Sequence, residues 1–234
     1  MSVFAPKFQA VVRDLYQPQD GAGIMSKVLK TWKNILSNPT SLAFSALSAA
    51  SYGGLFTFLA SSAFVFITLL GLSKPQFGMV MFFASICYVS STFVCRRLLL
   101  RLTVQETTGI AALFSLAGGT LMGLLAWAGV VNVWAIVLPL GLFMLGHGIH
   151  QPCGQSGAIG PFPKSAGAAS AMNGFFMMVI AFCIGSWLGL RMDGTVLPLT
   201  NGLWFWFWSL LIALSAWVLV RKYGHQQLHA AVQA

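Results

Sequence analysis

The sequence contains very little charge, and acidic residues are its scarcest class. Only 7% of its 234 residues are charged, with 4 acidic residues against 13 Lys and Arg. A soluble globular domain has about 25% charged residues, so this composition excludes an ordinary water-soluble protein. Residues 34 to 73 contain no charged side chain, and a membrane-spanning helix requires only about 20 apolar residues. The chain is therefore predicted to be an integral membrane protein.

Cysteine is also scarce, and its spacing excludes two common uses. The cysteines are Cys87, Cys95, Cys153 and Cys183, which lie in apolar stretches and form no CxxC pair. A disulfide framework or a zinc knuckle would need cysteines at short, regular spacings. The pattern favours buried, unreactive thiols.

The net charge of +9 comes from short basic clusters between apolar runs and not from one basic surface. This distribution argues against a nucleic-acid partner and instead indicates orientation in a membrane. Two basic residues, Lys74 and Arg191, fall near one set of predicted helix ends. The other set has Lys27, Lys30, Lys33, Arg96, Arg97, Arg101, Lys164, Arg221 and Lys222. By the positive-inside rule, both termini are predicted to be cytoplasmic.

Six apolar runs are long enough, or nearly so, to cross a bilayer. They are Thr40–Leu70, Gln76–Cys95, Thr107–Gly129, Val133–Ile149, Ser165–Leu190 and Val196–Val220. The predicted fold class is an all-α integral membrane protein with six transmembrane helices in a domain of residues 38–222. The first run is longer than one span requires, so we expect it to tilt, to bend near Gly53 and Gly54, or to project past the bilayer.

Three shorter segments complete the predicted organisation. Residues 24–37 place apolar side chains at helical spacing with lysines between them, which predicts an amphipathic helix on the cytoplasmic leaflet. A surface linker is the alternative for this segment. Residues 1–23 have no such pattern and are expected to be mobile, and residues 223–234 are expected to form a cytoplasmic tail.

Small residues recur four apart within the predicted spans, as expected where helix backbones approach closely in lipid. The pairs are Gly119 and Gly123, Gly167 and Ala171, Ser170 and Gly174, and Gly185 and Gly189. They predict a tightly packed bundle.

The stretch GHGIHQPCGQ, residues 146–155, places polar and ionisable groups after a purely apolar run. His147 and His150 share a helix face, but a metal site needs three or four converging ligands, and no other span contains a histidine or carboxylate. A redox enzyme that uses these histidines and Cys153 is the least favoured alternative, because a haem held between helices needs a facing ligand. We therefore expect no metal, no cofactor and no enzymatic activity.

The same stretch is predicted to be the cytoplasmic end of the fourth span, because Pro152 and several glycines disfavour a continuing helix. Polar side chains would then meet water at the interface. His150 is expected to have no special role. His147, about one turn deeper, is a candidate for lining a cavity or relaying protons, since ionisable groups at membrane depth commonly mark a pathway.

Several separated motifs resemble the C-terminal half of a major facilitator superfamily transporter, and more narrowly the Bcr/CflA drug-resistance branch of proton-driven multidrug exporters. They are SYGGLFTFLASSAFVFITLLGLSKPQFG (Ser51–Gly78), CRRLLLR after the second span, PFPKSAGAASAMNGFF before and within the fifth, and GLRMDGTVLPLTNG (Gly189–Gly202). The resemblance covers about Lys27 to Tyr223. It implies two inverted repeats of three helices, equivalent to one half of the major facilitator fold, in a bacterial inner membrane.

The resemblance also implies a function and a set of residues. The function is proton-coupled efflux of small amphipathic compounds, by a half that is inactive alone and pairs with an N-terminal half or a second copy. Substrate would bind at the face between halves, for which the candidate lining residues are Tyr52, Phe56, His147, Gln151, Asn173 and Phe176. Arg96, Arg97 and Arg101 would form a cytoplasmic loop that sets topology and contributes to gating. The alternative is a truncated or relic membrane protein with a binding or scaffold role and no transport.

Overall fold

The computed structural model describes residues 21–130 and 132–191, together with residues 208, 210–212, 214, 215 and 217–219. Every regular element in these ranges is a helix, so the predicted all-α class is confirmed. Five helical segments among them are long and apolar enough to cross a membrane. Most of the predicted sixth span, Val196–Val220, lies outside the described residues, as do residues 1–20 and 220–234.

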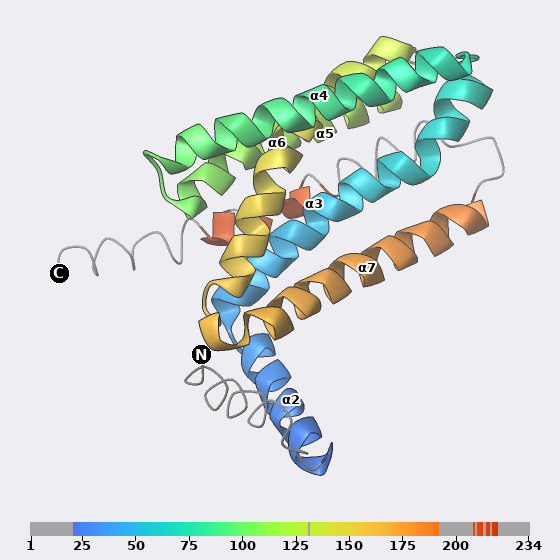
Figure 1. Ribbon diagram of the computed structural model, residues 1–234. Coiled ribbons are helices and arrows are strands. Elements are labelled where there is room, and N and C mark those ends of the chain that lie inside the picture. The colour runs from blue at the N-terminus through green and yellow to red at the C-terminus, as the bar shows by residue number, and fades with distance from the viewer. Residues whose placement is uncertain are drawn as a thin grey trace, which may run out of the picture.

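The elements follow one another with short connections (Figure 1). In chain order they are α2 (Gly21–Leu36), α3 (Pro39–Ala63), a π-helical turn η1 (Phe64–Leu69), α4 (Lys74–Leu99), α5 (Val104–Trp127), α6 (Val133–Ile159), a 3₁₀ turn η2 (Pro163–Ser165) and α7 (Ala166–Arg191). The five candidate spans are α3 with η1, α4, α5, α6 and η2 with α7 as far as Ile184.

The N-terminal ends of three spans are set by local sequence. Asn38 caps α3 by accepting a hydrogen bond from the first turn, and Ser73 with Gln76 forms a reciprocal capping box at α4. An equivalent box joins Thr103 and Glu106 at the start of α5. These side chains satisfy backbone N–H groups that have no partner inside the helix, so each helix begins where its cap lies.

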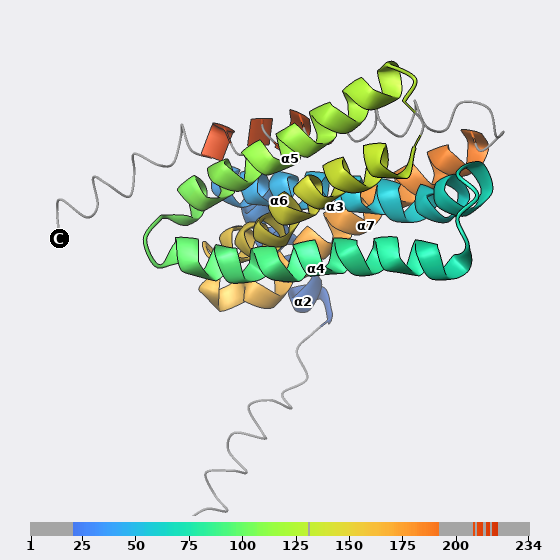
Figure 2. The ribbon, with the colours of Figure 1, turned by 90° about the horizontal axis from the view of Figure 1, so that it is seen from above.

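Helix α6 is the centre of the described bundle. It lies between α3 on one side and α4 and α5 on the other (Figures 1 and 2). In its apolar window 67% of residues are buried, against 17% in α4. A helix that contacts neighbours on several sides needs small side chains on each of those sides. In α6 these small residues are mainly glycines.

Close packing around α6 depends on glycines on both sides of its interfaces. A Cβ placed on Gly118 of α5 would lie 2.6 Å from the Pro139 carbonyl oxygen and 2.7 Å from the Phe143 nitrogen, both in the α6 backbone. Within α6, a Cβ on Gly146 would collide with Ser115 of α5, and one on Gly148 would collide with Ser91 of α4. These positions allow backbones to approach to distances that any side chain would prevent.

The predicted end of the fourth span at GHGIHQPCGQ is wrong. Helix α6 continues through this stretch and ends at Ile159, with Pro152 inside it. The proline removes one hydrogen bond to the carbonyl of Gly148, but packing against neighbouring helices stabilises helices that contain Gly and Pro in a membrane. The glycines here serve interhelical packing and do not end the helix.

Helix α3 is also continuous where a bend near Gly53 and Gly54 was one expectation. Both glycines make room for aromatic rings: a Cβ on Gly54 would collide with the Phe143 ring, and one on Gly53 would lie 3.0 Å from the Trp208 ring. The irregular part is η1, where Leu70 N–H donates to the Val65 carbonyl in a π-type bond. A π-helical turn changes the helical register, and it lies at the end of α3 that leads to α4.

Helix α2 projects away from the bundle beyond the start of α3 (Figure 1). Of its apolar side chains, Ile35 is buried against Phe162 and Met172, whereas Leu29 and Trp32 are 58% and 46% exposed. Within the described residues the helix already includes Gly21, three positions before the predicted start at Ile24. Its exposed apolar side chains support the proposal that α2 lies on a lipid surface.

Two of the predicted small-residue contacts are not used in the described bundle. A Cβ on Gly167 or on Gly174 of α7 would meet nothing within 4 Å. A Cβ on Gly118, where α5 meets α6, would instead lie 2.6 Å from a backbone atom of the neighbouring helix. Spacing alone identifies small residues but does not show which of them faces a neighbouring helix.

We predict that Gly118→Ala and Gly174→Ala have opposite effects on stability. Gly118→Ala forces a methyl group into the α6 backbone and should lower the free energy of unfolding by about 1–3 kcal/mol. Gly174→Ala adds the same atom in open space and should leave stability unchanged or raise it by up to about 1 kcal/mol, because alanine favours helix. Thermal unfolding in detergent measures both. Equal destabilisation by the two variants would contradict the packing at Gly118.

Candidate functional site

A row of buried polar side chains lies between α3 and α6. Three hydrogen bonds cross this interface: Ser41 Oγ to the Ala158 carbonyl at 2.9 Å, Gln151 Nε2 to the Ser48 carbonyl at 3.3 Å, and Ser51 Oγ with His147 Nδ1 at 2.7 Å. Rising numbers on α3 pair with falling numbers on α6, so the two helices are antiparallel. The hydrogen bonds fix their register, because sliding either helix would leave polar groups unpaired.

The imidazole of His147 is held from three directions. It is 3% exposed and bonds Ser51, while the Tyr88 ring lies 5.7 Å away and the Phe143 ring stacks at 6.3 Å between centroids. A serine hydroxyl both donates and accepts, so it can bond either tautomer of the neutral ring. His147 therefore lies in a fixed place with an adaptable hydrogen-bond partner.

A cavity of about 460 Å³ opens between α3, α4, α6 and α7. Its lining is mostly apolar with a few polar groups, which is the usual composition of a small-molecule site. The lining residues are Tyr52, Leu55, Phe58, Leu59, Met81, Ala84, Ser85, Tyr88, Val89, Met144, His147, Gln151, Gln155 and Met177. Methionine side chains adapt to ligands of varied shape.

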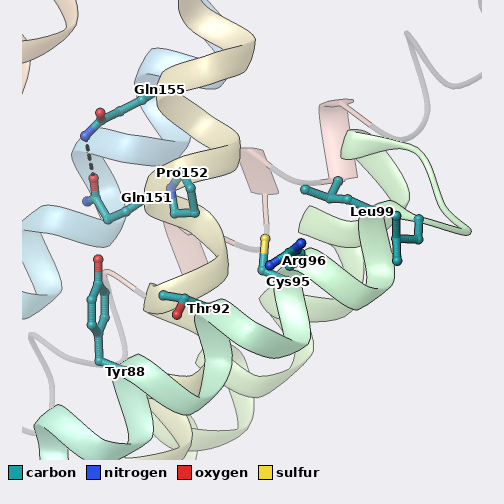
Figure 3. Close-up of a pocket in the computed structure, with 9 residues that line it drawn as sticks. Tyr88, Thr92, Cys95, Arg96, Leu99, Gln151, Pro152 and Gln155 are labelled. Atoms are coloured by element: carbon teal, nitrogen blue, oxygen red, sulfur yellow. Dashed lines mark hydrogen bonds between the residues drawn. The ribbon is translucent and has the colours of Figure 1, made fainter.

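A second cavity, of about 600 Å³, adjoins the first along α4 and α6 (Figure 3). It shares Tyr88, Gln151 and Gln155 with the first cavity and adds Thr92, Cys95, Arg96, Leu99, Leu100 and Pro152. Figure 3 shows Gln151 and Gln155 on α6 facing Tyr88 of α4, with Arg96 further along α4. We call the two adjoining cavities, which share Tyr88, Gln151 and Gln155, the α4–α6 groove.

Three of the predicted lining residues come together in this groove. Tyr52, His147 and Gln151 all line the 460 Å³ cavity, although Tyr52 lies far from the other two in sequence. Sequence reasoning missed Tyr88 and Gln155. Gln155 lies one helical turn after Gln151, on the same face of α6. Helical spacing would have identified it if the predicted fourth span had extended beyond Ile149.

The other three predicted lining residues lie outside the groove. Phe56 is half-buried and stacks on Tyr52 at 6.3 Å. Asn173 is 3% exposed, and its Oδ1 has no hydrogen-bond partner among the described residues. Phe176 packs against the cluster that contains Ile35 and Met172.

The three arginines do not form a loop as predicted. Arg96 and Arg97 lie in the last turn of α4, which ends at Leu99, and only Arg101 lies in the connection to α5. Cations are favourable at a helix C-terminus, where they interact with carbonyl groups that have no partner inside the helix. Arg96 lines the groove, whereas Arg97 does not.

His150 is not at a water interface as expected. Its side chain is fully buried, and neither ring nitrogen has a hydrogen-bond partner among the described residues. The continuation of α6 to Ile159 places this residue inside the bundle and not at its edge.

Two of the cysteines meet inside the bundle. Cys95 Sγ of α4 and Cys153 Sγ of α6 lie 3.6 Å apart, and both residues are buried. In the described part of the chain, no three His, Cys, Asp or Glu side chains are grouped so as to hold a metal ion. The thiol pair is therefore a contact between helices.

We predict that Ser51→Ala destabilises the protein by about 1–3 kcal/mol, because it leaves the buried Nδ1 of His147 without its partner. The matched control is Ser85→Ala, since Ser85 is exposed and bonds only the Met81 carbonyl of its own helix. That variant should change stability by less than about 0.5 kcal/mol. Thermal unfolding of the two variants in detergent measures the difference, and similar values for both would contradict the importance of the Ser51–His147 bond.

We predict that oxidation of the protein in membranes joins Cys95 to Cys153 and leaves Cys87 and Cys183 free. The two sulfur atoms need to move from 3.6 Å to about 2.05 Å to form the bond. Mass spectrometry of peptides from the oxidised protein identifies the linkage. A preferred linkage to any other cysteine would contradict the packing of α4 on α6.

Comparison with known proteins finds a similarity in sequence. No protein-family model and no solved structure matches the chain. The chain is similar to Multidrug resistance protein D of Escherichia coli (strain K12), with 29% identity over 207 residues. The match covers 86% of this chain and 50% of that protein, so the chain spans about half the length of the curated relative it matches.

The relative is named for multidrug resistance and not for an enzymatic reaction, in agreement with the expectation that this chain is not an enzyme. Its similarity, together with five helices among the described residues that are long and apolar enough to cross a bilayer, supports a multi-pass membrane protein.

Proposed function

We propose that this chain is one half, the C-terminal half, of a major facilitator transporter of the Bcr/CflA branch that exports small amphipathic compounds. The observation that carries the proposal is the groove between α3, α4, α6 and α7, which combines an aromatic and methionine wall with His147 and Gln151. The similarity to a multidrug resistance protein over half of that protein's length supports the same conclusion.

The partner in this proposal is a second half-transporter, either a separate N-terminal half or another copy of the chain. A carrier with substrate at its centre needs a wall on each side of the ligand. The groove supplies one wall, made of side chains from four helices. The described bundle and residues 196–220 would together form six spans in two inverted triplets.

Proton coupling is proposed to involve His147. It is an ionisable residue in the groove wall, and it has a hydroxyl partner that tolerates either tautomer. Protonation would place a charge in a poorly hydrated site, which would favour the exchange of a proton for substrate. The coupling group in this half is thus proposed to be an imidazole and not a carboxylate.

The proposed location is the bacterial inner membrane, with both termini in the cytoplasm. The last turn of α4, with Arg96 and Arg97, and the following Arg101 would lie on the cytoplasmic side. In this proposal they fix the topology by the positive-inside rule, and movement of the α4–α5 connection gates access to the groove. The exposed face of α2 would lie on the same leaflet.

We predict that cells lacking their own efflux pumps retain less Nile red, an uncharged lipophilic dye, when they express this chain with a matching N-terminal half. The chain alone should have no effect, because one wall does not enclose the substrate. Dye fluorescence in energised cells measures retention. Unchanged retention with both halves, each present in the membrane, would support a scaffold or relic and overturn the transport proposal.

Two variants in the same assay distinguish a specific role of His147 from a general effect of substitution on the protein. His147→Gln keeps a hydrogen-bonding group beside Ser51 but removes ionisation, so active export should fall by roughly tenfold or more while dye binding to purified protein persists. Phe182→Leu is the control, since Phe182 of α7 is 75% exposed on the outside of the bundle. Equal export by the His147→Gln variant and the unmodified pair would exclude His147 as the coupling group.

A further inference from the structure

The two ends of the α4–α6 groove differ in chemistry. The end between α3, α4, α6 and α7 is lined mostly by aliphatic, aromatic and methionine side chains such as Leu55, Phe58 and Met144, with His147 among its uncharged polar groups. The other end, along the last turns of α4, has Thr92 and Arg96 as its polar groups. The shared residues between them include Gln151 and Gln155, and the only Lys, Arg, Asp or Glu in the described lining is Arg96 at the second end.

Helical spacing explains how Arg96 enters the groove. Tyr88, Thr92 and Arg96 are four residues apart and therefore lie on one face of α4, the face that lines the cavity in Figure 3. Arg97 is one position further and lies about 100° around the helix, outside the cavity lining. The two neighbouring arginines thus have the same charge but different access to the groove.

Arg96 is the only Lys, Arg, Asp or Glu among the described residues that line the groove. Glu106 is the only carboxylate in the described ranges, and it is bound to Thr103 in the cap of α5. No described ion pair therefore neutralises Arg96. The described lining of the groove carries a positive charge at one end and contains no carboxylate.

We propose that the groove selects amphipathic molecules with an anionic head, which binds at Arg96 while the apolar body lies between α3, α4, α6 and α7. This inference rests on the proposed function and defines the class of substrate. Guanidinium groups form strong, charge-assisted hydrogen bonds with anionic oxygens. The hydroxyl of Thr92 and the amide of Gln155 line the same cavity and can add uncharged hydrogen bonds to such a head.

The same charge acts against cationic amphiphiles. A cationic head near Arg96 would be repelled, and no carboxylate in the described lining could offset the repulsion. Selectivity would therefore come both from attraction of anions and from rejection of cations. An uncharged amphiphile would bind with intermediate affinity through the apolar end.

The test uses three radiolabelled probes that share a decyl chain and differ in the head: decanoate, decanol and decyltrimethylammonium. Binding to the purified full chain is measured in nanodiscs of phosphatidylcholine, with empty nanodiscs as background for partitioning into lipid. We expect the order decanoate, decanol, decyltrimethylammonium from tightest to weakest. Cation binding as tight as decanoate binding would overturn the inference.

Two variants connect the preference to one side chain. Arg96→Gln should weaken decanoate binding by roughly tenfold, as expected for loss of a hydrogen bond to a charged group, and leave decanol binding unchanged. Arg97→Gln removes the same charge from the same helical turn but outside the groove, so it should keep the full preference. Unchanged decanol binding also shows that the Arg96→Gln protein is folded. Equal losses of decanoate binding in both variants would show a general surface-charge effect and overturn the inference.

The remaining outcomes distinguish this inference from the proposed function and from binding of lipid. If none of the probes binds above empty nanodiscs, the groove is not a ligand site and the proposed function fails with the inference. If all three bind equally, only the charge selectivity fails. If phosphatidylglycerol in the nanodiscs displaces decanoate from the unmodified protein, the Arg96 end holds a lipid headgroup, and the inference is overturned.

Discussion

The close approach of helix backbones to α6 is the constraint on which the rest of this bundle depends. In lipid, burial of apolar surface between helices gains little, so association relies on van der Waals contact and interhelical hydrogen bonds. Gly118 of α5 and Gly146 and Gly148 of α6 permit that contact. Because α6 is central, α3 and α4 pack on different sides of it, and the α6 residues His147, Gln151 and Gln155 lie in the groove that both helices line.

This arrangement also explains how polar groups are accommodated. The residues from His147 to Gln155 that bond α3 or line the groove are separated by glycines that bring the neighbouring helices close. Short interhelical distances place Ser48 and Ser51 within hydrogen-bonding reach of α6. The same stretch therefore provides both packing contacts of the bundle and the polar wall of the groove, because it contains both glycines and polar residues.

Much of the fold was predictable from local sequence. Apolar runs identified the described spans, and the caps Asn38 and Ser73 that start α3 and α4 are equally local features, because both act within a few residues along the chain. The C-terminal end of α6 was predicted wrongly because Gly and Pro152 have the same local signature at a helix end and in a packed helix. Neighbouring helices decide between the two, and they lie far away in sequence.

The sequence by itself determined that the chain is an α-helical membrane protein, since hydrocarbon admits few other structures for long apolar runs. The resemblance seen in the sequence also gave Tyr52, His147 and Gln151 as candidate lining residues. Only the tertiary structure decided that these three line one groove with Tyr88, that Asn173 is buried away from it, and that Arg96 lines it whereas Arg97 does not. The rotation of each helix about its axis is set by contacts with its neighbours, and a uniformly apolar span carries almost no local signal of that rotation.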